Sequence, residues 1–183
     1  MGYAGGTKKG PSYHDLGDHS EVVQIDFDPS RISYKELLDI FWKSHDPTGD
    51  SWFRQYRQAI FYHNELQRKA ATESRDKLAA ETKERIATAI EPYSGFYLAE
   101  DYHQKRNLRA YPELMGEFGA MFPEMKSLIN STAVTRVNGY LGGNGSCGSL
   151  KEQIESFGLS GRAKEILTSV VCGRKASITC PVR

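Results

Sequence analysis

Apolar and polar residues alternate along positions 21–27, and this pattern predicts a β-strand. Val23, Ile25 and Phe27 share one face, and the residues between them are polar. Glu21 falls on the apolar face, at the start of the predicted strand. A carboxyl group in apolar surroundings is costly to ionise, so we expect Glu21 to persist as a neutral acid that can donate a proton. The alternative is that Glu21 lies just outside the strand, in water.

A helical period follows this alternation. Between Ser33 and Ser44, apolar residues recur every three or four positions, which predicts an amphipathic helix with one wide apolar stripe. Ser33 and Glu36 have the spacing of a capping box, which marks the N-terminus of a helix. Pro47 disfavours helical backbone in the residue before it, so we expect the helix to end near Ser44.

Shorter patterns predict the remaining elements of the first hundred residues. Residues 1–20 are rich in Gly, Asp, His and Pro and predict a loop. Apolar runs at 58–62 and 96–98 predict two short buried strands. Between these runs, a long polar helix capped by Asn64 is predicted to extend to about Ile90, where a proline follows.

Beyond residue 100 the pattern is mostly helical. A helix is predicted from Glu100 onward, and helical patches recur over 110–135. A glycine-rich loop is predicted over 139–148. Residues 149–171 predict a helix–turn–helix, and a basic tail follows. The C-terminal part of the chain is therefore predicted to be a helical extension.

Composition narrows the class of protein. The chain has 183 residues, of which 26% are charged, and its formal net charge is only +1. This charge gives no general reason to expect a nucleic acid or an anionic membrane as partner. No apolar run approaches the roughly 20 residues of a membrane span. The N-terminus has no signal-peptide core, so we expect a cytoplasmic protein with reduced thiols, although a preceding segment could carry a targeting signal.

Two kinds of side chain suggest chemistry. The phenols of Tyr13 and Tyr56 are candidate hydrogen-bond donors to a substrate oxygen, although each taken singly reads as an ordinary half-buried tyrosine. Cys172 and Cys180 lie close together in the basic tail, where nearby cations favour the thiolate. These cysteines are either a pair for disulfide exchange or two inert reduced thiols. The five histidines are scattered with no His-x-x-x-His pair, so we expect no metal site.

Several short segments, taken together, resemble one enzyme family. In chain order they are GYAGG at 2–6, PSY at 11–13, GDHSEVV at 17–23, ISYKELLDIFW at 32–42, HDPT at 45–48, RQYRQAI at 54–60 and AEDYHQ at 99–104. Their sequence, order and approximate spacing resemble those of the type-A peptide methionine sulfoxide reductases.

The resemblance implies an activity in oxidative stress repair. These enzymes use thiols to reduce methionine S-sulfoxide, either free or in proteins, to methionine. Carried over by position, Glu21 matches the acid, and Tyr13 and Tyr56 match the tyrosines that hold the sulfoxide oxygen. The resemblance implies no bound cofactor, and thioredoxin or another dithiol as reductant. It favours the interpretation of Glu21 as an acid over that of a solvated residue.

The thiol is where this sequence departs from the family pattern. The nucleophile implied by the resemblance lies in a Gly-Cys-Phe-Trp run before Gly-Tyr-Ala-Gly-Gly, and that run has no match here. The cysteines that remain as candidate resolving thiols are Cys147, Cys172 and Cys180. We therefore expect a truncated reductase. The alternative is a catalytically inactive form that binds oxidised methionine or only exchanges disulfides in its tail.

The resemblance also implies a fold. We expect an α+β protein with a ferredoxin-like split β-α-β two-layer sandwich that lacks its first strand and first helix. Residues 1–106 would form the truncated catalytic domain, and 107–183 a helical extension with the cysteine-bearing tail. The missing elements should leave apolar residues accessible on the strand at 22–27 and the stripe at 34–42. We expect a monomer.

Overall fold

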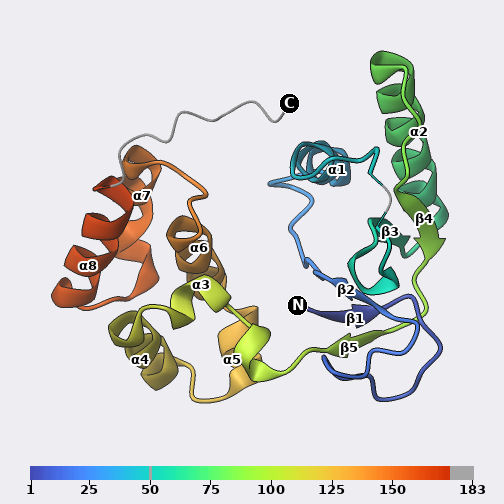
Figure 1. The fold of residues 1–183 in the computed structure, drawn as a ribbon. Coiled ribbons are helices and arrows are strands. Elements are labelled where there is room, and N and C mark those ends of the chain that lie inside the picture. Colours follow the sequence, from blue (N-terminus) through green and yellow to red (C-terminus); the bar gives the residue numbers. More distant parts are fainter. Residues whose placement is uncertain (50, 174–183) are drawn as a thin grey trace. The chain divides into compact units, whose positions relative to one another are not determined.

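A computed structural model of the chain describes residues 1–49 and 51–173. The fold is α+β, and the chain divides into two compact units at Glu100 and Asp101. The first unit contains all the strands of the described residues, whereas the second is helical (Figure 1).

A three-stranded antiparallel sheet forms the base of the first unit. Strand β1 (Gly2–Ala4) lies in the middle, between β2 (Ser20–Val22) and β5 (Phe96–Leu98) (Figure 1). The prediction of a loop over residues 1–20 is therefore wrong at its start. Tyr3 explains why the segment is a strand, because its side chain is completely buried in the core of this sheet.

Strand β2 is shorter than the alternating pattern predicts. Its last pair with β1 is Gly2 opposite Val22, and in the described part of the chain no other strand pairs with it. The predicted strand at 21–27 is therefore wrong beyond Val22. Val23 and Ile25 are 72% and 58% exposed, which confirms the expectation of accessible apolar residues on this segment.

Helix α1 (Tyr34–Lys43) is confirmed, together with its capping box. Glu36 donates its backbone N–H to Ser33 Oγ at 3.2 Å, and its carboxylate accepts the Ser33 N–H at 2.8 Å. Leu38 and Trp42 are buried in a small core with residues of β3 and α2. The expectation of an accessible stripe is therefore wrong at these two positions.

The other sheet of the first unit is a parallel pair, β3 (Ala59–Tyr62) and β4 (Ala89–Pro92), joined by helix α2 (Glu65–Thr82). Asn64 caps α2 as predicted, by accepting the backbone N–H of Gln67 at 2.9 Å. The predicted extension of this helix to Ile90 is wrong. The helix ends at Thr82, and β4 pairs with β3 instead, because a parallel partner is available there.

The second unit packs several short helices around one apolar core. They are α3 (Arg106–Arg109), α4 (Pro112–Met121), α5 (Met125–Asn130), α6 (Thr132–Leu141), α7 (Cys147–Gln153) and α8 (Gly161–Cys172). Short 3-10 turns, η1 (Arg54–Tyr56) in the first unit and η2 (Asp101–His103) and η3 (Ile154–Phe157) in the second, complete the elements. The predicted glycine-rich loop at 139–148 is shorter than expected, because α6 continues to Leu141 and α7 begins at Cys147.

Over the described ranges, no helix is both long and apolar enough to cross a membrane.

Candidate functional site

The loop between β1 and β2 is organised around the carboxylate of Asp18. This carboxylate accepts the backbone N–H of Thr7 at 2.8 Å and that of Lys8 at 3.1 Å, and these hydrogen bonds hold the pKa of Asp18 far below its usual range. The next residue, His19, is buried; its Nδ1 accepts the Gly6 N–H, and its Nε2 donates to the Lys8 carbonyl. Gly6 is required here, because a Cβ would lie 2.6 Å from the backbone nitrogen of His19. The loop is therefore fixed at its base.

A second carboxylate anchors the segment that carries Tyr13. Glu100 accepts the backbone N–H of Tyr13 at 3.0 Å through one oxygen, and the phenol of Tyr3 at 2.6 Å through the other. Because Tyr3 lies in the central strand β1 and is fully buried, Glu100 ties the Tyr13 segment to the buried centre of the sheet.

Turn η1, which carries Tyr56, docks on the same loop. Arg54 donates to the Asp18 carbonyl at 2.6 Å and to the Gly5 carbonyl at 3.1 Å. The Ser20 hydroxyl donates to the carbonyl of Arg54 at 2.8 Å. These bonds bring η1 against β2, although the two segments are more than thirty residues apart in the sequence.

Tyr13, Tyr56 and Glu21 come together at this junction. The phenols of Tyr13 and Tyr56 are hydrogen-bonded to each other, and this bond raises the pKa of Tyr56; reduced solvation and electrostatic interactions with Tyr13 and Glu21 add to the effect. Glu21 is half-buried within β2, and Gln55 donates to its Oε1 at 2.6 Å. Two phenols and one carboxyl group thus form a cluster of potential donors to a single oxygen atom.

An ion pair connects the two sheets beside this cluster. The guanidinium of Arg57 binds both oxygens of Glu91 in β4, at 2.5 and 2.6 Å, and its Nε donates to Ser20 Oγ in β2 at 2.9 Å. This pairing holds the pKa of the Glu91 carboxyl below its usual value and raises the pKa of Arg57. The network keeps β2 in place relative to β3 and β4.

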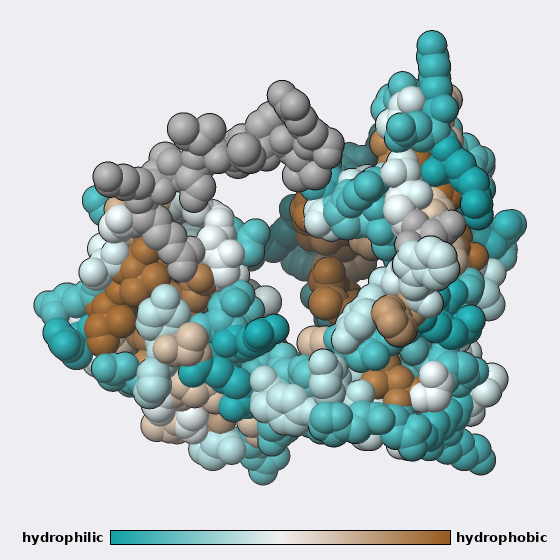
Figure 2. All heavy atoms as spheres, in the orientation of Figure 1, coloured by the Kyte–Doolittle hydropathy of each residue, from teal (hydrophilic) through white to brown (hydrophobic). Residues whose placement is uncertain are grey.

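A mostly apolar groove of about 500 Å³ opens beside β2, and Glu21 and Arg57 are among the residues that line it. Its walls are the segment after β2, helix α1 and strand β3, and the apolar side chains on the first of these are visible in Figure 2. Two polar atoms of residues that line it, Tyr34 Oη and His45 Nε2, are buried without a hydrogen-bond partner. Burial raises the pKa of the Tyr34 phenol. Burial of a polar atom without a hydrogen bond raises the free energy of the folded state. The surface of the groove therefore resembles a protein interior that lacks some of its packing and hydrogen-bonding partners.

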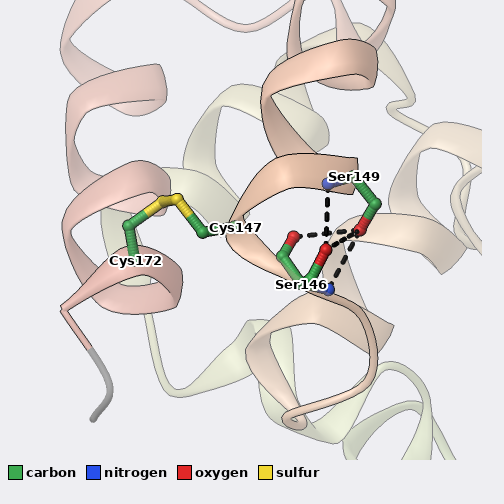
Figure 3. The surroundings of a disulfide bond; sticks show 4 residues. All are labelled: Ser146, Cys147, Ser149 and Cys172. Atoms are coloured by element: carbon green, nitrogen blue, oxygen red, sulfur yellow. Dashed lines mark hydrogen bonds between the residues drawn. A yellow bond between two sulfur atoms is a disulfide. The ribbon is translucent and has the colours of Figure 1, made fainter. Parts of the chain in front are cut away.

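The candidate thiols are found in the second unit. Cys147 and Cys172 form a disulfide that joins the start of α7 to the end of α8 (Figure 3). Ser146 and Ser149 form a capping box at the start of α7, next to this disulfide (Figure 3). Cys180 lies outside the described residues. Across the parts of the chain that the structure describes, no group of three or more His, Cys, Asp or Glu side chains is placed to hold a metal ion.

Sequence reasoning assigned no role to four residues that build this site. Asp18, His19, Gln55 and Glu100 all lie within the segments that carried the family resemblance. Their roles depend on partners that are 10 to 97 residues away in the sequence, as in the pairs Lys8–Asp18 and Tyr3–Glu100. The sequence did carry a signal for Asp18, which follows a glycine in a polar loop. An aspartate in such a loop often accepts hydrogen bonds from backbone N–H groups.

A family model described as peptide methionine sulfoxide reductase matches residues 1–117. A relative from Drosophila melanogaster, named peptide methionine sulfoxide reductase, is 40% identical over 162 residues. This match covers 87% of the present chain and 65% of the relative, so the chain spans about two thirds of the length of that protein.

Two further comparisons agree with this match. The protein named peptide methionine sulfoxide reductase MsrA from Methanothermobacter thermautotrophicus is 47% identical over 116 residues, which cover 57% of this chain and 69% of the relative. The crystal structure of Mxr1 from Saccharomyces cerevisiae in reduced form is similar with a TM-score of 0.56 and 32% identity. That similarity covers 61% of this chain and 69% of the yeast chain.

Proposed function

Because the chain belongs to the peptide methionine sulfoxide reductase family, we propose that it takes part in the thiol-dependent reduction of methionine S-sulfoxide. The observation that carries this proposal is the cluster of Tyr13, Tyr56 and Glu21. The two phenols would hold the sulfoxide oxygen by hydrogen bonds, and Glu21 would supply the proton that this oxygen needs. The substrate would be methionine S-sulfoxide, free or within a protein.

The reaction has a simple balance. A thiolate attacks the sulfoxide sulfur, and the sulfur–oxygen bond of the sulfoxide breaks as its oxygen takes up one proton and passes to the attacking sulfur. The products are a thioether and a sulfenic acid; the sulfoxide is reduced by two electrons and the thiol is oxidised by two. A second thiol then condenses with the sulfenic acid, which forms a disulfide and releases water. Thioredoxin or another dithiol would reduce that disulfide, which is a step favoured in a reducing compartment such as the cytoplasm.

The thiols for this cycle are part of the proposal. Residues 1–146 contain no cysteine. The resolving thiol would be one of Cys147, Cys172 and Cys180, and the disulfide between the first two supports the idea that thiols of the second unit undergo oxidation. The proposal includes the reduction of the sulfoxide, thioredoxin or another dithiol as the reductant, and a monomeric protein.

We propose that residues 1–106 carry the family's ferredoxin-like sheet and that residues 107–183 are the helical extension with the cysteine-bearing tail. The unit β3–α2–β4 supplies a β-α-β crossover to such a fold, and its two parallel strands pair directly with each other. The apolar groove beside β2 is where a further strand of that fold would pack, with Val23 and Ile25 against it.

Reduction of a defined peptide tests the function. The chain is incubated with dithiothreitol and a short peptide that contains either the S or the R epimer of methionine sulfoxide, and methionine is measured by chromatography. We expect consumption of the S epimer alone, with a large loss of rate in Glu21→Leu. Equal consumption of both epimers, or none, would contradict the proposal. A variant with serine at all three cysteines shows whether they supply the attacking thiol.

A further inference from the structure

The contact between Gln55 and Glu21 has a defined geometry. Gln55 donates its side-chain N–H to Oε1 of Glu21 at 2.6 Å, and both residues are half-buried. The donor belongs to η1, which is fixed through Arg54 to carbonyl groups of the β1–β2 loop. The acceptor belongs to β2. The Gln55 amide therefore reaches the carboxyl group from a turn that is held by hydrogen bonds, and the position of the amide is set before any ligand binds.

We propose that Gln55 is a positioning residue that gives the two oxygens of Glu21 different tasks. Oε1 accepts the amide N–H, and Oε2 carries the proton that is offered to a sulfoxide oxygen. In a neutral carboxylic acid, one oxygen carries the proton and the other is a carbonyl acceptor. Because the N–H of Gln55 occupies Oε1, the proton is directed to Oε2. This inference rests on the proposed function.

The same amide acts again after the proton has left. The carboxylate that remains is stabilised by a donor on Oε1, because hydrogen bonds to an ionised acceptor are stronger than those to a neutral one. Gln55 therefore both selects the donating oxygen and favours release of its proton. A side chain that only filled space at position 55 would do neither.

Other charged and titratable groups lie close to Glu21, and no substitution at position 55 replaces any of them. Tyr3 pairs with Glu21 across β1 and β2, Tyr13 and Tyr56 interact with each other beside it, and Tyr34, His45, Arg57 and His63 line the same groove as Glu21. Differences among variants of residue 55 therefore report the group at that position and not its surroundings.

The test compares three variants that change the donor in opposite ways. Gln55→Leu removes the N–H, Gln55→Lys replaces it with a cation, and Gln55→Glu replaces it with a second carboxyl group. Binding of a methionine S-sulfoxide tripeptide is measured by calorimetry from pH 5 to 9. The pH profile of the affinity should move to higher pH in Gln55→Leu and further in Gln55→Glu, and to lower pH in Gln55→Lys, because a hydrogen-bond donor or a cation favours an ionised carboxylate and a second carboxyl group disfavours it.

Controls separate this inference from the function on which it rests. Gln153→Leu makes the same change at a half-buried glutamine that bonds Arg136 in the second unit, and its profile should match the wild type. The titration midpoint of the Glu21 carboxyl, followed by carbon NMR without ligand, should shift in the same order among the variants. No tripeptide binding by the wild type, with those NMR shifts present, contradicts the proposed function and supports the pairing. Identical NMR midpoints and binding profiles in folded Gln55→Leu and Gln55→Lys would overturn the inference.

Discussion

The two units of this chain are stabilised in different ways. The helical unit has one continuous apolar core, in which the side chains that are completely buried include those of Leu108, Leu114, Phe118, Leu150 and Leu167. The first unit has two small apolar clusters and an open groove. Its loops are held instead by carboxylates, with Asp18 and Glu100 as the centres. The candidate site lies in the unit that depends on polar contacts, because the hydrogen bonds that fix its loops also position its phenols and its acid.

The largest expected effect comes from the helical core. Phe118→Ala removes a completely buried ring and leaves a cavity, and a change of this kind lowers the free energy of unfolding by about 3–5 kcal/mol. The second unit should unfold at a clearly lower denaturant concentration, measured by circular dichroism, while the transition of the first unit stays in place. The matched control is Phe53→Ala, because Phe53 is 71% exposed and its loss should change stability by less than about 0.5 kcal/mol. Equal effects of the two changes would contradict the comparison.

Reduction of the disulfide should have the next largest effect. The bond between Cys147 and Cys172 closes a loop with a sequence separation of 25 residues, so its loss should destabilise the second unit by about 3 kcal/mol. Denaturant unfolding with and without dithiothreitol measures this. The double variant Cys147→Ser with Cys172→Ser should reproduce the reduced value and no longer respond to dithiothreitol. If reduction shifted the unfolding transition of the first unit and not that of the second, this prediction would be contradicted.

Loss of the ion pair between the sheets should have a smaller effect, in the first unit. Glu91→Gln removes a partly exposed carboxylate from Arg57, and after allowance for solvent screening we expect a loss of about 1 kcal/mol. Because the folded-state pKa of Glu91 is depressed, its contribution is present above the unfolded value near 4.5 and is lost as the pH falls through the lower folded value.

The first unit should therefore lose stability on acidification below pH 4.5 less steeply in Glu91→Gln than in the wild type. Thermal unfolding at a series of pH values measures this. Glu65→Gln is the control, because Glu65 pairs with Arg68 on an exposed helix surface and should contribute little. An unchanged acid slope in Glu91→Gln would show that the network does not hold the sheets.

The smallest expected effect concerns the two phenols. Their hydrogen bond raises the pKa of Tyr56 above its ordinary value of 10.0, so Tyr56 should ionise later than an exposed tyrosine in an ultraviolet titration. Tyr13→Phe removes the partner and should return that pKa toward 10.0. Tyr102→Phe, at an exposed tyrosine of the second unit, should remove one ionisation without moving that of Tyr56. No change in Tyr13→Phe would mean that the two phenols are not in contact in solution.

Local signals in the sequence predicted those elements that local interactions stabilise. The capping box of α1 and the Asn64 cap of α2 were predicted because each involves residues three positions apart. Strands β1 and β4 were missed, since three or four residues acquire strand geometry only through distant partners. The alternation at 23–27 predicted a strand that does not form, because the pairing of β2 with β1 ends at Val22.

The candidate site shows the same limit. The alternating pattern singled out Glu21, residue type suggested Tyr13 and Tyr56, and the family resemblance gave all three their roles; the structure brings them together. Gln55 lies within the segment at 54–60 that carries part of the resemblance, yet nothing in its neighbours indicates that its amide reaches a carboxyl group 34 residues earlier in the sequence. Residue types suggested the chemistry, whereas the supports of the site depended on the folded chain.

The central claim is that two phenols and one carboxyl group form a site for a sulfoxide oxygen. The most direct test is whether the chain prefers oxidised to unoxidised methionine. Calorimetry would compare a methionine S-sulfoxide tripeptide with the same tripeptide containing unoxidised methionine. Hydrogen bonds to the sulfoxide oxygen should make the oxidised peptide bind about tenfold more tightly or better, and Tyr13→Phe combined with Tyr56→Phe should remove most of that preference. Equal affinity of the wild-type chain for the two peptides would contradict the account.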